Sequence, residues 1–151
     1  MNGLIGESLS CGLVDSGCTS TVCGKAWLKC YKESLSEKES SLITETNSTH
    51  SFRFGKGDPV ISQKIVTLPA KLGGKHVFIK SDVVEADIPL LLSNQTMKKA
   101  EAVLDFKKEV VMLFGKEHPL LFTTSGHYII PLCDTRKVIY SNSIKDNQTL
   151  K

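Results

Sequence analysis

The sequence predicts a mostly β fold with one or two short helices. Residues 52–92 alternate polar side chains with aromatic or β-branched ones, which is typical of antiparallel strands. The pair Gly73 and Gly74 lies within this stretch and marks a hairpin turn. Further apolar runs, "AVLDF", "EVVMLFG" and "HYIIPL", have the length of strands.

Composition limits the possible functions. The chain has 151 residues, the length of one domain that can bury a sizeable core. Lys and Arg number 19 against 16 Asp and Glu, and this small excess is spread along the chain, so charge does not indicate nucleic-acid binding. No apolar run reaches the roughly 18 residues of a membrane helix. An odd count of 5 cysteines without a leader favours free thiols and a cytoplasmic location.

The N-terminal third is predicted to hold two strands, a helix and a connection. "NGLIG" and "SCGLV" are expected to be short strands. The apolar side chains of Ala26, Trp27, Cys30 and Tyr31 form a stripe that predicts a helix. Residues 34–51 are rich in Ser, Thr, Glu and Asn, so we expect a flexible surface connection there.

The C-terminal half is predicted to contain more strands and one helix. "IPLLLS" reads as an apolar strand, after which Ser93 or Asn94 could cap a short helix. "SGHYIIPL" is expected to be an edge or interface strand, and residues 133–151 a polar disordered tail.

One carboxylate stands directly after an apolar strand, in "GLVDSGCTST". Burying an isolated ionised carboxylate is costly, so a protein pairs it, shifts its pKa or uses it for chemistry. Gly17 lets the backbone turn tightly and approach a ligand. Asp-Ser-Gly alone is also an ordinary turn sequence, so the segments around it must distinguish a catalytic loop from a simple turn.

The stretch "LVDSGCTST" resembles the active-site loop of aspartic proteases. The order of segments is similar to the retropepsin family, the single-lobe proteases of retroviruses and long-terminal-repeat retrotransposons. "FRFGKGDPV" resembles the flap hairpin and "KIVTLPAKLGGKHVFIKSDVV" the long hairpin behind it; "DIPLLLS" resembles the strand under the catalytic loop, and "NQTMKKAEAVLDF" the helix and strand that follow. The resemblance implies a retropepsin-like domain over residues 1–132 with a closed, barrel-like β fold.

The same resemblance assigns roles to individual residues. It implies that Asp15 is the catalytic carboxylate. The active-site loop then includes Ser16, Gly17 and Thr19. The flap tip, which closes over an extended peptide, is expected to consist of Phe54, Gly55, Lys56 and Gly57.

Activity would require two copies of the chain. No other aspartate lies in an Asp-(Ser/Thr)-Gly sequence, so the second carboxylate has to come from a homodimer partner. In the family the two carboxylates share one proton and activate a water, without metal or cofactor. The resemblance implies an aspartic endopeptidase whose substrate is a retrotransposon-type polyprotein.

Three other functions compete with this one. The spacing of Cys11, Cys18, Cys23 and Cys30 matches no common zinc pattern. No cysteine occupies a recognisable activated position beside a histidine, which disfavours cysteine-protease chemistry. The third is an inactive retropepsin-like dimerisation or protein-interaction module, because Ser93 stands where the family has glycine and its side chain would strain a tight backbone approach.

Overall fold

The computed structural model describes residues 10–133 and is mostly β, as predicted. The expected strand in "NGLIG" and the polar tail after Cys133 lie outside the described residues. Helical structure in the described part is limited to α2 (Lys25–Ser34), α3 (Glu37–Ser40) and α4 (Asn94–Lys99). None of these helices is long and apolar enough to cross a membrane.

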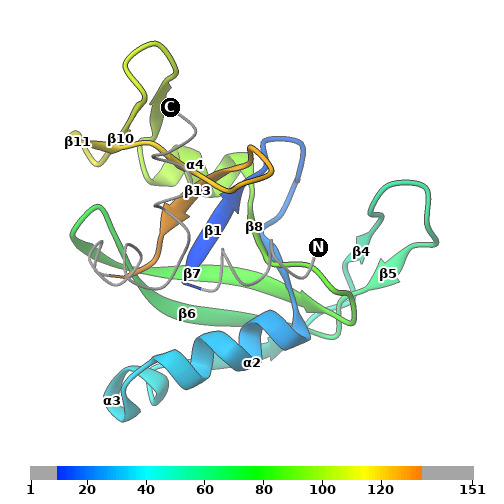
Figure 1. The fold of residues 1–151 in the computed structure, drawn as a ribbon. Coiled ribbons are helices and arrows are strands. Elements are labelled where there is room, and N and C mark those ends of the chain that lie inside the picture. Colours follow the sequence, from blue (N-terminus) through cyan, green and yellow to red (C-terminus); the bar gives the residue numbers. More distant parts are fainter. Residues whose placement is uncertain (1–9, 134–151) are drawn as a thin grey trace.

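Eight strands form the main sheet (Figure 1). In spatial order they are β12 (Leu121–Phe122), β13 (Tyr128–Pro131), β1 (Cys11–Val14), β8 (Leu90–Leu92), β2 (Val22–Gly24), β7 (Lys75–Val84), β6 (Lys64–Leu72) and β3 (Thr44–Asn47). A second sheet contains β9 (Val103–Asp105), β10 (Val110–Leu113) and β11 (Lys116–Pro119). The two short strands β4 (Ser51–Phe52) and β5 (Val60–Ile61) pair only with each other.

The main sheet is rolled but has two edges. β12 and β3 are its end strands and do not pair with each other. Near one end of the hairpin β6–β7, however, the backbone amide of Lys71 donates to the carbonyl of Leu132, just after β13, at 2.9 Å. The sheet therefore curls far enough for strands near its opposite ends to be joined, while the described strands form no continuous barrel.

The long hairpin β6–β7 and helix α2 build the largest part of the core. The hairpin turns at Gly73 and Gly74, whose φ angles of 56° and 85° suit the predicted two-residue turn. The predicted helix is confirmed, and Trp27 and Tyr31 are buried with their rings stacked at 4.9 Å. The predicted apolar stripe needs correction, because Ala26 and Cys30 are exposed and Leu28 is buried in their place. The hydroxyl of Tyr31 donates to the carbonyl of Pro69 in β6 at 2.7 Å, which attaches the helix to the hairpin.

Two local predictions need correction. Residues 34–51, expected to be a flexible connection, contain α3, which begins with a capping box of Ser36 and Glu39, and β3, which pairs with β6. The side chains of β3 are all exposed, so the strand has no apolar alternation that could reveal it. The strand β13 pairs with β1 and β12 on its two sides, so the expectation that it is an edge strand is wrong.

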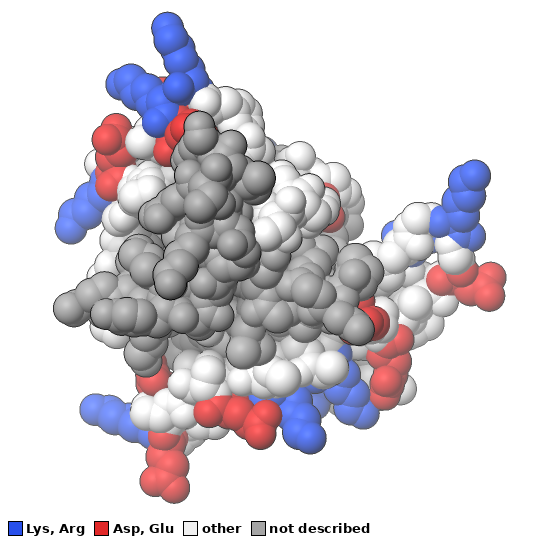
Figure 2. Space-filling view, in the orientation of Figure 1, with Lys and Arg blue, Asp and Glu red and all other residues white. Residues whose placement is uncertain are grey.

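Charged side chains are mixed in sign over the visible described surface. Figure 2 shows Lys and Arg beside Asp and Glu around the rim and on the protruding hairpin β4–β5. This agrees with the small net charge of +3.

Candidate active site

The Asp15 loop, residues 15–21, connects two strands that lie on either side of β8. β1 runs parallel to β8, with Val14 opposite Leu92, and β2 meets β8 on its other side, with Val22 opposite Leu91. The amide of Asp15 donates to the carbonyl of Leu92 at 3.0 Å, so β8 fixes the point at which the loop begins. The predicted position of "IPLLLS" next to this loop is therefore confirmed.

Two glycines allow these strands to approach closely. A Cβ atom at Gly12 would lie 2.6 Å from side-chain atoms of Leu92, which is fully buried. At Gly24 it would lie 2.3 Å from the carbonyl oxygen of Ala86. Both distances are shorter than any van der Waals contact, so the packing around β8 requires glycine at these positions.

The carboxylate of Asp15 lies at the surface of the single chain. Its side chain is half-buried, and its Oδ1 accepts a hydrogen bond from the amide of Gly17 at 3.1 Å. The amide of Cys18 donates to the carbonyl of Asp15 at 3.1 Å, which closes the turn. The described residues provide no hydrogen bond to Oδ2, and Ser16 and Thr19 are exposed. The loop thus binds one carboxylate oxygen through its own backbone and leaves the other without a hydrogen bond from the described residues.

The thiol of Cys18 is not activated. Burial, and to a lesser extent the negative charge of Asp15, raises the pKa of Cys18 above its usual value. The sulfur donates a hydrogen bond to the carbonyl of Ser20 at 3.0 Å. A protonated, bonded thiol is a poor nucleophile, so the geometry gives no support to cysteine-protease chemistry.

The hydroxyl groups of Thr21, Ser93 and Thr96 form a hydrogen-bonded network where the Asp15 loop ends. Thr21 Oγ1 lies 2.6 Å from Thr96 Oγ1 and donates to Ser93 Oγ at 3.2 Å. It also accepts from the backbone amide of Ser93 at 3.0 Å. Ser93 Oγ accepts from the amide of Thr96 at 3.2 Å, and so caps helix α4.

This network corrects the expectation for Ser93. Its backbone has φ −70° and ψ 162°, an ordinary extended conformation of a cap residue, so no strain follows from its side chain. The residue is only 2% exposed, and its hydroxyl is satisfied by the neighbouring groups. Ser93 therefore takes part in supporting the Asp15 loop. The sequence predicted a cap residue before α4, whereas the contact between this residue and Thr21 depends on the tertiary fold.

The predicted flap residues occupy the turn of the hairpin β4–β5, which protrudes from the body in Figure 1. Gly55 has φ 66°, which favours glycine, and Lys56 is exposed. Phe54 stacks on Phe52 with ring centroids 6.1 Å apart and packs in the same apolar cluster as Cys18 of the Asp15 loop. Otherwise, no hydrogen bond or ion pair joins residues 54–57 to residues 15–19 in the described structure.

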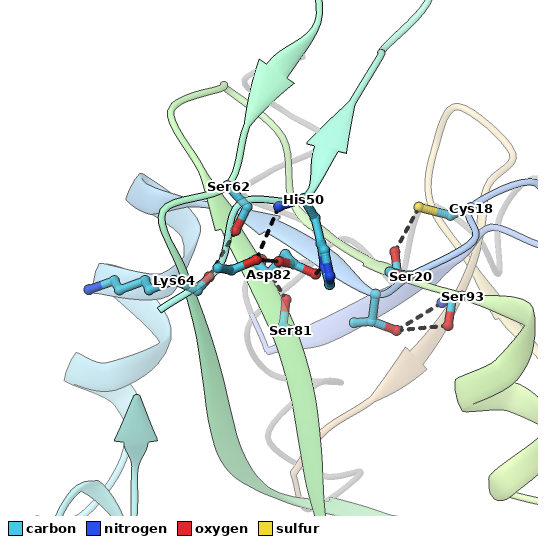
Figure 3. Close-up of polar contacts among 10 residues, drawn as sticks. Cys18, Ser20, His50, Ser62, Lys64, Ser81, Asp82 and Ser93 are labelled. Atoms are coloured by element: carbon cyan, nitrogen blue, oxygen red, sulfur yellow. Dashed lines mark hydrogen bonds and ion pairs between the residues drawn. The ribbon is translucent and has the colours of Figure 1, made fainter. Parts of the chain in front are cut away.

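A further polar cluster at the foot of the hairpin was not predicted. The carboxylate of Asp82 in β7 contacts Ser48 and His50, which precede β4. Figure 3 shows His50 beside Asp82. The signal available in the sequence was an acidic residue within "FIKSDVV", an otherwise β-type segment. No group of three or more His, Cys, Asp or Glu side chains is arranged to hold a metal ion in residues 10–133.

Among known proteins, only solved structures match this chain. No protein-family model matches the chain, and no curated protein sequence matches it either. Among solved structures, the chain is similar to the retroviral protease-like domain of Ddi1 from Leishmania major. The sequences are 15% identical, the match covers 76% of this chain and 92% of that one, and the TM-score is 0.43. At this TM-score and identity, the similarity establishes neither a family nor an activity.

Proposed function

We propose that the chain is a retropepsin-like aspartic endopeptidase that acts as a homodimer. The observation that carries the proposal is the placement of "DSG" at the end of β1, where β8 anchors the loop and one carboxylate oxygen of Asp15 remains without a hydrogen bond in the described structure. Two further features support it: the loop rests on a buried hydroxyl network, and Phe54 of the glycine-containing hairpin packs against the same apolar cluster as Cys18 of the loop.

The proposed chemistry requires two Asp15 carboxylates across a twofold axis. Like charges a few ångströms apart cannot both ionise cheaply, so the pair shares one proton and polarises one water. One carboxylate acts as the general base toward this water. The protonated one donates to the oxygen of the scissile carbonyl, and no covalent intermediate or cofactor is required.

The substrate in this proposal is an extended polypeptide held beneath the hairpin β4–β5. Strand-like substrates bind through main-chain hydrogen bonds, with alternating side chains in pockets. The natural substrate we propose is a retrotransposon-type polyprotein that includes this domain. Closure of residues 54–57 over the peptide would exclude bulk water from the reacting centre and retain the one water that the carboxylates activate.

Substitution of Asp15 tests the proposal directly. Purified protein is incubated with an unfolded protein substrate at mildly acidic pH, with and without a statine-type inhibitor. We expect inhibitor-sensitive cleavage that falls by at least about a thousandfold in Asp15→Asn, because the shared proton and the general base are both lost. Asp105→Asn is the matched control, because it makes the same change at a half-buried aspartate that ends β9, and its Oδ1 can still accept from the amide of Lys108.

Mixing the two proteins tests whether the partner supplies the second carboxylate. A heterodimer of wild type and Asp15→Asn has one carboxylate, so excess variant should inhibit wild-type activity and Asp105→Asn should not. Activity that is insensitive to excess variant would refute the shared site. A stable dimer without cleavage under any condition would instead support the inactive interaction module.

A further inference from the structure

We propose that Ser48, His50 and the buried carboxylate of Asp82 form a clamp that sets the position of the hairpin β4–β5 relative to the Asp15 loop. The inference rests on the proposed function only where it treats the hairpin as a substrate flap. We use "hairpin clamp" for these three residues. They are positioning residues, since none of them touches Asp15.

The hairpin needs an anchor because it is weak on its own. β4 and β5 have two residues each and pair with no other strand of the described structure. An isolated two-stranded hairpin is marginally stable in water. The residues just before β4 and just after β5 form the two legs of the hairpin. Two backbone hydrogen bonds join these legs: the amide of Ser62 donates to the carbonyl of His50 at 2.8 Å, and the amide of Ser48 donates to the carbonyl of Gln63 at 3.1 Å.

The carboxylate of Asp82 holds one of these legs. Ser48 Oγ donates to Asp82 Oδ1 at 2.7 Å, and His50 Nδ1 lies 3.1 Å from Oδ2. The Asp82 side chain is 4% exposed, whereas the His50 ring is 57% exposed. A buried carboxylate is costly without partners, and these are the only side-chain partners it has in the described residues. Movement of the leg away from β7 would therefore leave the carboxylate buried and unpaired.

The backbone of the same residue holds the Asp15 loop. The amide of Asp82 donates to the carbonyl of Thr21 at 2.9 Å, where the loop ends and β2 begins. Thr21 is also the centre of the hydroxyl network beneath the loop. Figure 3 shows His50 and Asp82 of the clamp at the foot of β4 and β5, with Ser20 and Ser93 on the side of the loop. One residue thus connects the hairpin leg and the loop, each through direct hydrogen bonds.

Hydrogen exchange tests the clamp without requiring enzymatic activity. In Ser48→Ala and His50→Ala, we expect the amides of residues 48–63 to exchange roughly tenfold faster, because a hydrogen bond to a charged group stabilises the closed form by about that factor. His50→Asn should restore slow exchange, since its amide nitrogen can replace Nδ1 as a donor. His76→Ala, an exposed histidine on the same strand as Asp82, is the control and should leave these amides unchanged.

Peptide-cleavage kinetics test the coupling to the Asp15 loop. If the wild type cleaves peptides, His50→Ala and Ser48→Ala should raise KM several-fold, with kcat changed less than about twofold, because substrate is held less well before the chemical step. Unchanged exchange at residues 48–63 in both variants would overturn the clamp. Faster exchange with unchanged KM would overturn its role in positioning. Faster exchange in a protein that cleaves nothing would refute the proposed peptidase and leave the clamp supported.

Discussion

Substitution of Ser93 by alanine tests whether this side chain stabilises the Asp15 loop or strains the backbone beside it. The residue is 2% exposed, and its hydroxyl accepts from the amide of Thr96 and from Thr21 Oγ1, each at 3.2 Å. The same hydroxyl donates to Thr96 Oγ1 at 3.2 Å. Ser93→Ala removes these three bonds but leaves the 2.6 Å contact between Thr21 and Thr96 in place. The backbone bond from Ser93 to Thr21 is also retained.

The expected loss follows from these contacts. Removal of an N-cap hydroxyl costs about 1 kcal/mol. Loss of the two bonds to the hydroxyls of Thr21 and Thr96, which keep the bond to each other, costs about 1 kcal/mol more. The sum, about 2 kcal/mol, corresponds to a fall in Tm of roughly 6–8 °C for a domain of this size. Ser36→Ala is the matched control, because it removes an exposed cap from α3 and should cost under about 1 kcal/mol.

Urea titration provides the assay. The chain has one tryptophan, Trp27, which is fully buried, so its fluorescence reports unfolding of the core. Ser93→Gly distinguishes support from strain: relief of strain would raise the free energy of unfolding, whereas loss of the hydroxyl should lower it. The reasoning would be refuted by a Ser93→Ala variant as stable as wild type, or by a Ser93→Gly variant that is more stable.

Three further predictions concern the rest of the fold. Burial raises the pKa of Cys11 to about 12, so iodoacetamide at about pH 8 should modify exposed Cys30 in the native protein and Cys11 only after unfolding; mass spectrometry that finds both modified equally fast would contradict this. Gly24→Ala should lower the free energy of unfolding by about 3 kcal/mol or more, since the new methyl group meets backbone oxygen at 2.3 Å; a variant of unchanged midpoint in urea would oppose it. A hydrogen bond from Lys64 lowers the pKa of Glu45. The stabilisation that this bond gives the folded state is therefore present at neutral pH and disappears as acid protonates the Glu45 carboxylate. Glu45→Gln should therefore cost under about 0.5 kcal/mol at about pH 7 and nothing at about pH 2.5, because the pair is 35% and 42% exposed; equal costs at both pH values would exclude this cause.

Features set by neighbouring residues could be predicted from the sequence. The turn at Gly73 and Gly74, the helix α2 and the cap before α4 were all predicted, because each depends on residues that are close together in the sequence. The short strand β2 and the exposed strand β3 were not predicted. Three residues are too few for a periodic pattern, and a strand exposed on every side chain has none.

Around the candidate site, the sequence determined the Asp15 loop, because its signature lies in consecutive residues. Only the tertiary structure decided what supports it. Thr21 and Ser93 are 72 positions apart, and Ser48 and Asp82 are 34 apart, yet each pair shares a hydrogen bond. Such partners are selected by strand pairing across the sheet, which brings distant segments together and leaves no local periodicity in the chain. The sequence alone therefore determined where the acidic loop is, and the fold decided which polar groups are buried beneath it and which residue connects it to the hairpin.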